Sequence, residues 1–147
     1  MKVAAVQLTS TGKITENQEL ALAKIREAAG NGARLIVLPE ATAQNFRSGR
    51  LDEQAQTLEG PFATAIQALA EELEVTVVAG MFCPADTVER DGKTINRVTN
   101  TALIAGPGVL GGYDKIHTYD AFDYRESDTV LAGESLVAFD VDDLIVG

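Results

Sequence analysis

The stretch RLIVLPEAT, residues 34–42, contains four consecutive large apolar residues followed by a proline and a glutamate. An apolar run of this kind is typical of a short strand buried on both faces of a parallel sheet. Pro39 has no N–H to donate to a strand ladder, so it ends the strand. Glu40 then lies at the carboxyl end, where open α/β sheets bind their ligands. Glu40 is therefore a candidate for proton transfer, the alternative being a carboxylate that only faces water.

The residues before this stretch predict a βαβ unit. Residues 2–8 are apolar and β-prone. Thr15 and Gln18 match a capping box, which would open a helix that ends near Ala29. With the strand at residues 34–38, this order predicts two parallel strands joined by a right-handed crossover.

The residues after it predict a second βαβ unit and then antiparallel strands. The pair Gly60-Pro61 places a proline at the first position of a second helix. Residues 75–82 are nearly all apolar and predict a third, central strand. Asp91-Gly92 predicts a hairpin turn, and residues 95–105 and 109–113 predict an antiparallel pair. The fold class is α/β.

The carboxyl-terminal residues predict a strand at residues 136–139, a turn at residues 140–143 and the start of another buried strand at residues 144–147. A carboxylate on a buried strand would cost several kcal/mol unless it were paired. We therefore expect residues 1–147 to be the amino-terminal part of one longer domain.

The composition excludes several classes of protein. The formal net charge is −10 and no cluster of lysine and arginine is present, so we expect no nucleic-acid partner. No stretch approaches the roughly 20 apolar residues of a membrane span, and the apolar run at the amino terminus is broken by Gln7, too early for a signal peptide. Cys83 is the only cysteine, which excludes an intrachain disulfide. We expect a cytoplasmic protein with no membrane partner.

Lys115 and Glu126 are the other two candidate catalytic residues. Lys115 follows the strand expected at residues 109–113, so its side chain should reach the same edge of the sheet as Glu40. A lysine that faces a carboxylate can stabilise an oxyanion and lower the pKa of a neighbouring thiol. Glu126 lies in the polar loop of residues 124–128. The alternative for both residues is a side chain exposed to solvent.

Other residues with reactive side chains are weaker candidates. His117 is the only histidine and could act as a general base, although a histidine near a turn more often makes structural hydrogen bonds. Cys83 has no basic neighbour in the sequence, which favours a small buried hydrophobe over a nucleophile. Four acidic residues within residues 120–128 lack the spacing of a calcium-binding loop, so no metal site is expected. They are Asp120, Asp123, Glu126 and Asp128.

Together these features resemble the nitrilase superfamily of carbon–nitrogen hydrolases over the whole chain. The similar motifs are KVAAVQ at residues 2–7, LPE at residues 38–40, YDKIH at residues 113–117 with Asp120, RES at residues 125–127, and Gly133. The family more often has arginine where Asp114 stands. The resemblance implies an αββα sandwich, two mixed sheets between helix layers, that is incomplete here on its carboxyl-terminal side.

The resemblance also implies a mechanism without a cofactor or a metal. Glu40 would be the general base for a cysteine thiol and then the acid for the leaving amine. Lys115 would stabilise the oxyanion of the tetrahedral intermediate, and Glu126 would hold Lys115 and the substrate in place. The substrate would be a small linear amide, hydrolysed through a cysteine thioester by a homodimer or a higher homo-oligomer.

The nucleophile of this mechanism is absent from the 147 residues. In the family the cysteine follows a strand similar to residues 144–147, so we expect it shortly after Gly147. Cys83 is not at that position. Two alternatives stay open: an acyltransferase that uses the same machinery, and a non-catalytic α/β binding module.

Overall fold

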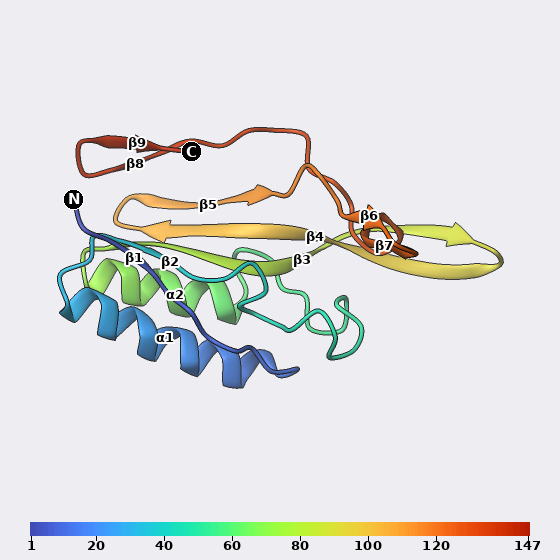
Figure 1. The fold of residues 1–147 in the computed structure, drawn as a ribbon, viewed down its shortest axis with the longest axis horizontal. Helices are drawn as coiled ribbons and strands as arrows, with labels where there is room; N and C mark the ends of the chain where they lie inside the picture. Colours follow the sequence, from blue (N-terminus) through green and yellow to red (C-terminus); the bar gives the residue numbers. More distant parts are fainter.

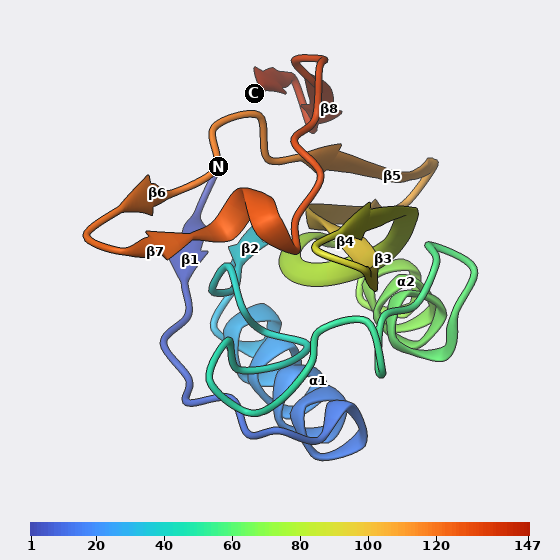
Figure 2. The ribbon, with the colours of Figure 1, turned by 90° about the vertical axis from the view of Figure 1, so that its right-hand side faces the viewer.

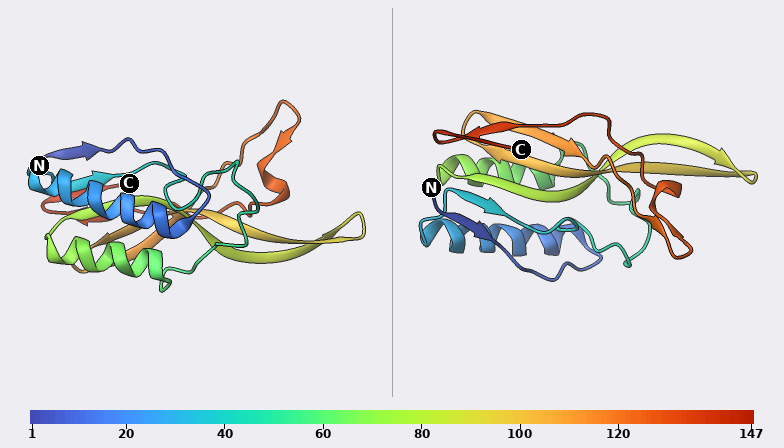
Figure 3. Two further views of the ribbon diagram at one scale, coloured as in Figure 1. Left: turned by 90° about the horizontal axis from the view of Figure 1, so that it is seen from below. Right: turned by 45° about the horizontal axis from the view of Figure 1, so that its top comes forward.

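A computed structural model describes residues 1–147 and contains a five-stranded mixed sheet with two helices packed on one of its faces (Figure 1). The two helices lie side by side beneath the sheet (Figure 3). They are α1 (Ile14–Gly30) and α2 (Pro61–Glu72). The strands of the sheet are β1 (Val3–Ala5), β2 (Leu35–Val37), β3 (Thr76–Arg90), β4 (Lys93–Gly106) and β5 (Val109–Asp114).

The strands are ordered β1-β2-β3-β4-β5, and their directions decide which ends meet. β1, β2 and β3 are parallel, which confirms both predicted βαβ units, and β3 is the central strand. β4 is antiparallel to both of its neighbours. β5 therefore runs in the same direction as β2, and the carboxyl ends of these two strands lie at the same edge of the sheet.

The helix starts show one correct and one incorrect prediction. α2 begins at Pro61 as expected. α1 begins at Ile14, before the predicted capping box, and its cap residue Lys13 makes no capping bond with its side chain. The backbone N–H of Ile14 instead donates to Oε1 of Gln54, 3.0 Å away, on a distant loop. A tertiary contact thus replaces the local capping bond that the sequence suggested.

β3 and β4 form a hairpin that is longer than predicted. β3 continues to Arg90, eight residues beyond the expected end at residue 82, and the arm projects from the body of the molecule (Figure 1). The turn lies at Asp91-Gly92 as predicted, with φ of 52° and 71°. The end of β3 was missed because its side chains are mostly exposed and lack an apolar pattern.

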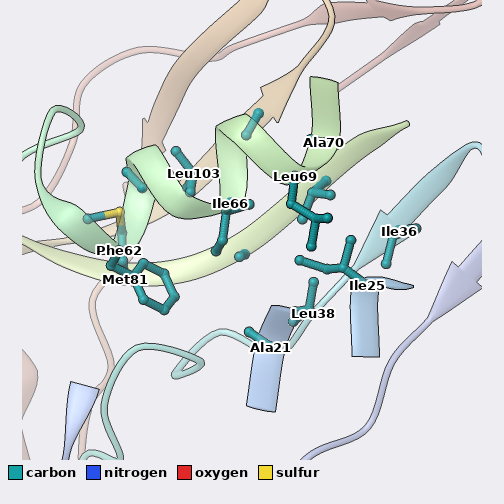
Figure 4. Packing of buried hydrophobic residues seen from close by; sticks show 14 of the residues in the cluster. Ala21, Ile25, Ile36, Leu38, Phe62, Ile66, Leu69, Ala70, Met81 and Leu103 are labelled. Atoms are coloured by element: carbon teal, nitrogen blue, oxygen red, sulfur yellow. The ribbon is translucent and has the colours of Figure 1, made fainter. Parts of the chain in front are cut away.

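The hydrophobic core lies between the helices and one face of the sheet (Figure 4). The largest fully buried apolar side chains of this core come from both helices and from β2, β3 and β4. They are Ile25, Ile36, Phe62, Ile66, Val77, Met81 and Leu103. Neither α1 nor α2 combines the length and the apolar character that crossing a lipid bilayer requires.

The last segment of the chain crosses the other face of the sheet. It contains β8 (Phe139–Val141) and β9 (Leu144–Val146), which pair only with each other. The predicted buried strand at residues 144–147 is wrong with respect to burial, because Leu144 is 51% exposed and Ile145 is 79% exposed. The apolar run forms one strand of a surface hairpin and does not join the main sheet.

Candidate active site

Glu40, Lys115 and Glu126 lie together at the edge of the sheet where β2 and β5 end. Nζ of Lys115 is 2.9 Å from Oε1 of Glu40 and 3.0 Å from Oε2 of Glu126. The structure thus brings together the three residues that the sequence singled out, although Glu40 and Lys115 are 75 positions apart. The ammonium group lies between two carboxyl groups.

Glu40 is placed by a close contact between its backbone and Gly80 in β3. The N–H of Gly80 donates to the carbonyl oxygen of Pro39 (3.1 Å), and the N–H of Ala43 donates to that of Gly80 (3.0 Å). A Cβ atom at position 80 would lie 1.5 Å from the carbonyl oxygen of Glu40. Only glycine allows this approach of the two segments.

Lys115 is placed in a similar way at the end of β5. Its N–H donates to the carbonyl oxygen of Asn100 (2.8 Å), and its carbonyl oxygen accepts from the N–H of Gly133 (3.0 Å). A Cβ at position 133 would lie 2.2 Å from the carbonyl oxygen of Asp114. The carboxylate of Asp114 accepts a hydrogen bond from the hydroxyl of Thr101 (2.6 Å), on the face of the sheet opposite to Asn100, so it does not compete for Lys115.

Glu126 lies at the start of the 3₁₀ turn η1 (Glu126–Asp128) and is buried, with 3% of its surface exposed. Both of its carboxylate oxygens accept hydrogen bonds. The hairpin formed by β6 (Asp120–Ala121) and β7 (Tyr124–Arg125) leads into this turn. Oε2 of Glu126 accepts the backbone N–H of Tyr119 at 2.7 Å. Its other oxygen faces Asn100 and Lys115, at 3.2 and 3.3 Å. A carboxylate with this many donors is held rigidly.

Asn100 is a site residue that the sequence reasoning missed. Its side-chain Nδ2 donates to Oε1 of Glu40 (2.7 Å) and to Oε1 of Glu126 (3.2 Å), and the residue is 3% exposed. It thereby links the two carboxylates that hold Lys115. A signal was present: asparagine is depleted in strands, yet Asn100 stands in the middle of the strand predicted at residues 95–105.

The contacts in this cluster shift two pKa values in opposite directions. Burial lowers the pKa of Lys115, but hydrogen bonds to Glu40 and Glu126 and their charges outweigh burial, so the pKa lies above its ordinary value. Burial raises the pKa of Glu126, but the hydrogen bonds from the Tyr119 N–H, Lys115 and Asn100 outweigh it, so the pKa lies below its ordinary value. At neutral pH Lys115 is a cation and Glu126 is an anion.

Glu126→Gln should lower the free energy of unfolding at about pH 7 by about 1.5–3 kcal/mol, the usual contribution of hydrogen bonds to a charged group. Because folding lowers the pKa of Glu126 below 4.5, its stabilisation is complete above that pH and is lost as the pH falls through the folded-state value. Urea unfolding at about pH 7 and about pH 3 should show that the difference between wild type and variant shrinks in acid.

The control for this measurement is Glu134→Gln. Glu134 is exposed and forms no ion pair, so the same substitution should leave stability unchanged at either pH. A destabilisation by Glu126→Gln that persisted undiminished in acid would contradict the ionic contribution of this residue.

A cavity of about 550 Å³ opens above the cluster. Figure 2 looks onto this edge of the sheet, from which the loop of residues 41–60 and the β6–β7 hairpin project. Half of the Glu40 side chain (51%) and 29% of the Lys115 side chain are exposed here. The cavity is lined by Glu40, Phe46, Arg47, Lys115, Tyr119, Tyr124 and Glu126. It has the size of a small-molecule site, with reactive groups at its base and aromatic side chains in its wall.

Comparison with known proteins agrees with this geometry. A family profile described as "Carbon-nitrogen hydrolase" matches residues 2–147. The chain belongs to the carbon-nitrogen hydrolase family. A protein of Mycobacterium tuberculosis named as a hydrolase is 41% identical to it, over 100% of this chain and 51% of the relative. The deaminated glutathione amidase of Synechocystis sp. is 36% identical, over 89% of this chain and 49% of that protein.

Solved structures of this family share the fold. A CN-hydrolase superfamily protein from Xanthomonas campestris matches 97% of this chain and 50% of its own with a TM-score of 0.78 at 23% identity. An amidase from Nesterenkonia sp. matches 95% of this chain and 51% of its own with a TM-score of 0.71 at 19% identity. The expected nitrilase-type αββα fold is confirmed, and this chain contains a five-stranded sheet with a helix layer formed by α1 and α2. The chain spans about half the length of the relatives it matches.

The remaining candidates of the sequence lie outside the cavity of this carbon-nitrogen hydrolase. Cys83 packs against the core on the helix-covered face of the sheet, and burial raises the pKa of its thiol. His117 is exposed and does not line the cavity. Asp120 accepts the N–H and hydroxyl of Ser127, and Asp128 pairs with arginines, so these two acids have structural partners.

Proposed function

We propose that this chain supplies the Glu–Lys–Glu part of an amidase that hydrolyses a small linear amide through a cysteine thioester. The observation that carries the proposal is the position of the Lys115 ammonium, held between Glu40 and Glu126 at the base of the cavity. Two named relatives support amide hydrolysis, the deaminated glutathione amidase of Synechocystis sp. and the omega-amidase of Homo sapiens, which is 27% identical over 95% of this chain and 50% of its own length.

The two carboxyl groups are suited to different roles because their surroundings differ. Glu40 is half exposed to the cavity and can exchange protons with a bound molecule. Glu126 is buried, and its oxygens are occupied by donors, so it orients Lys115 and carries no protons to the substrate. The Lys115 ammonium can stabilise negative charge that develops on an amide carbonyl oxygen.

The proposed reaction has two halves. A thiol attacks the amide carbonyl carbon while Glu40 takes its proton, and the C–N bond breaks as Glu40 returns that proton to the leaving nitrogen. Water then attacks the thioester with Glu40 as the base. The C–S bond breaks, the proton returns to sulfur, and the acid leaves.

We propose that the thiol belongs to a cysteine of the whole protein that lies after residue 147. Cys83 cannot act in this role, since it packs against the core on the face of the sheet opposite to Asn100. The relatives are about twice as long as this chain, so they contain residues that could complete the site.

The test is to incubate the whole enzyme with a panel of short amides and to measure ammonia release. Mass spectrometry of the quenched enzyme should find an acyl group on a cysteine other than Cys83. A product that is diverted from acid to a new amide by added amines would indicate acyl transfer. No turnover and no acyl-enzyme with any amide would contradict the proposal.

A further inference from the structure

Asn100 contacts all three members of the Glu40–Lys115–Glu126 cluster, although it does not line the cavity above them. Its carbonyl oxygen accepts the backbone N–H of Lys115, and its side-chain amide donates to one oxygen of each carboxylate. The amide nitrogen must face the carboxylates, because the opposite orientation would aim an oxygen at two negatively charged oxygens. Asn100 borders a smaller cavity of about 180 Å³, which Glu40 and Lys115 also line. We therefore expect Asn100 to act through these neighbours and not on a molecule in the larger cavity.

The two carboxylates depend on Asn100 to different degrees. Glu126 also accepts the backbone N–H of Tyr119 and the ammonium of Lys115, so it stays held without Asn100. Glu40 accepts two hydrogen bonds from the chain, from Asn100 at 2.7 Å and from Nζ of Lys115 at 2.9 Å, and both go to Oε1. Loss of the amide would leave Glu40 with a single donor. A carboxyl group with one donor can turn about that contact, whereas two donors from different strands fix its orientation.

Asn100 is the more rigid of the two donors to Glu40. It lies in β4, which is paired with a strand on each side, and 3% of its surface is exposed. The Lys115 side chain is long and flexible, and 29% of it is exposed. A long side chain loses more conformational freedom than a short one when its position is fixed. The orientation of the Glu40 carboxyl group therefore depends chiefly on Asn100.

We propose that Asn100 is a positioning residue that holds Oε1 of Glu40 and leaves Oε2 as the oxygen that takes up and returns the proton. This inference rests on the proposed function and assigns separate roles to the two oxygens of its acid–base group. The lone pairs of Oε1 are engaged by an amide and an ammonium, whereas those of Oε2 accept no donor from the chain.

The two oxygens then act as follows in the two halves of the reaction. In the first half, Oε2 takes the proton of the thiol and gives it to the leaving nitrogen. In the second half, Oε2 takes a proton from water and gives it to the leaving sulfur. Oε1 keeps both of its hydrogen bonds throughout, so the carboxyl group does not turn between the two transfers.

The test is steady-state hydrolysis of an amide by the whole enzyme after Asn100→Leu, which keeps a similar branched shape without a donor. kcat should fall about 10²-fold, the cost of displacing a reacting group by about 1 Å. KM should change little, because Asn100 does not line the larger cavity. Asn100→Asp keeps the size of the side chain and replaces its donor by an acceptor, so it should lose kcat at least as strongly. A residue that only filled space would keep kcat in this second variant.

The matched control is Asn96→Leu, the same substitution in the same strand. Asn96 is exposed, and its amide donates to Asp52 at 3.3 Å, outside the cluster, so this variant should keep the kcat of wild type. The thermal midpoint of each variant shows that it is folded at the temperature of the assay. A kcat of Asn100→Leu within about twofold of wild type, or a raised KM at unchanged kcat, would overturn the assignment.

A double-mutant cycle shows whether Asn100 acts through Glu40. Asn100→Leu should lower kcat of the Glu40→Gln enzyme by less than about threefold, because the group that Asn100 positions is already inactive. A further loss of about 10²-fold in that background would mean that Asn100 acts on another part of the site, which contradicts the proposal.

Crystal structures of the whole enzyme separate this inference from the proposed function. In Asn100→Leu the carboxyl group of Glu40 should turn from its wild-type orientation or occupy several, while Glu126 keeps its contacts with Tyr119 and Lys115. This result supports the hold of Asn100 on Glu40 even if the wild type hydrolyses no amide, an outcome that contradicts the proposed function alone. An unchanged orientation of the Glu40 carboxyl group rejects the inference even if amides are hydrolysed.

Discussion

Glu40→Gln should lower kcat of the whole enzyme by about 10²- to 10⁴-fold, the range that a general acid–base group contributes. Glutamine keeps the shape of the side chain, and its carbonyl oxygen can still accept from Lys115 and Asn100, but it cannot take up the proton of a thiol. The fold should survive, because Glu40 is half exposed and Lys115 keeps its bond to Glu126. The loss of an exposed ion pair costs about 1 kcal/mol or less.

The measurement is kcat with the best amide of the panel, together with the thermal midpoint of both proteins. Glu134→Gln provides a matched control with the same change at an exposed position, and its turnover should equal that of wild type. If Glu40→Gln enzyme turned over within a factor of about two of wild type, Glu40 would not be the proton carrier.

The placement of Glu40 and Lys115 at one edge of the sheet could be predicted from the sequence because it depends on strand direction. Their contact depends also on the segment after β2, which crosses β3 at Gly80. Each residue follows the carboxyl end of a strand that has a clear apolar pattern, and two antiparallel steps turn β5 into the direction of β2. Parallel strands of one sheet place the residues that follow them at the same edge. The same local patterns located α2 and the turn at Asp91-Gly92.

Glu126 and Asn100 show where such reasoning ends. The burial of Glu126 depends on the path of the loop after β5, which carries the N–H of Tyr119 to its carboxylate, and no local pattern encodes that path. Only the similarity of residues 125–127 to a family motif indicated it. The pattern around Asn100 predicts only a strand, and the partners of its side chain come from two distant segments.

The incorrect predictions also involve contacts that are distant in the sequence. The start of α1 is bonded by Gln54, which lies 40 positions away. The arm of β3 beyond Cys83 is held by its pairing with β4 and not by burial, so the apolar pattern stops before the strand does. Tertiary context thus overrides local propensity at these two places.

Gly80→Ala should remove most of the activity through a residue that touches no substrate. Its added Cβ would lie 1.5 Å from the carbonyl oxygen and 2.7 Å from the Cα of Glu40, so the segment that carries Glu40 must move. A displacement of about 1 Å at a reacting group can cost about 10²-fold in rate. The overpacked contact should also lower the free energy of unfolding by about 1–3 kcal/mol.

Gly111→Ala is the control that separates a clash from a general effect of alanine in this sheet. Gly111 lies in β5, and a Cβ there would meet no atom within 4 Å, so this variant should keep the activity and stability of wild type. Unfolding in urea and kcat/KM are measured on both variants. If Glu40 is displaced, the folded Gly80→Ala enzyme should lose turnover. Equal kcat/KM and equal stability of the two variants would show that the contact with Gly80 does not position Glu40. Loss of turnover by folded Gly80→Ala enzyme would show that the close approach of the Glu40 backbone to Gly80 in β3 positions the carboxyl group of Glu40 for proton transfer.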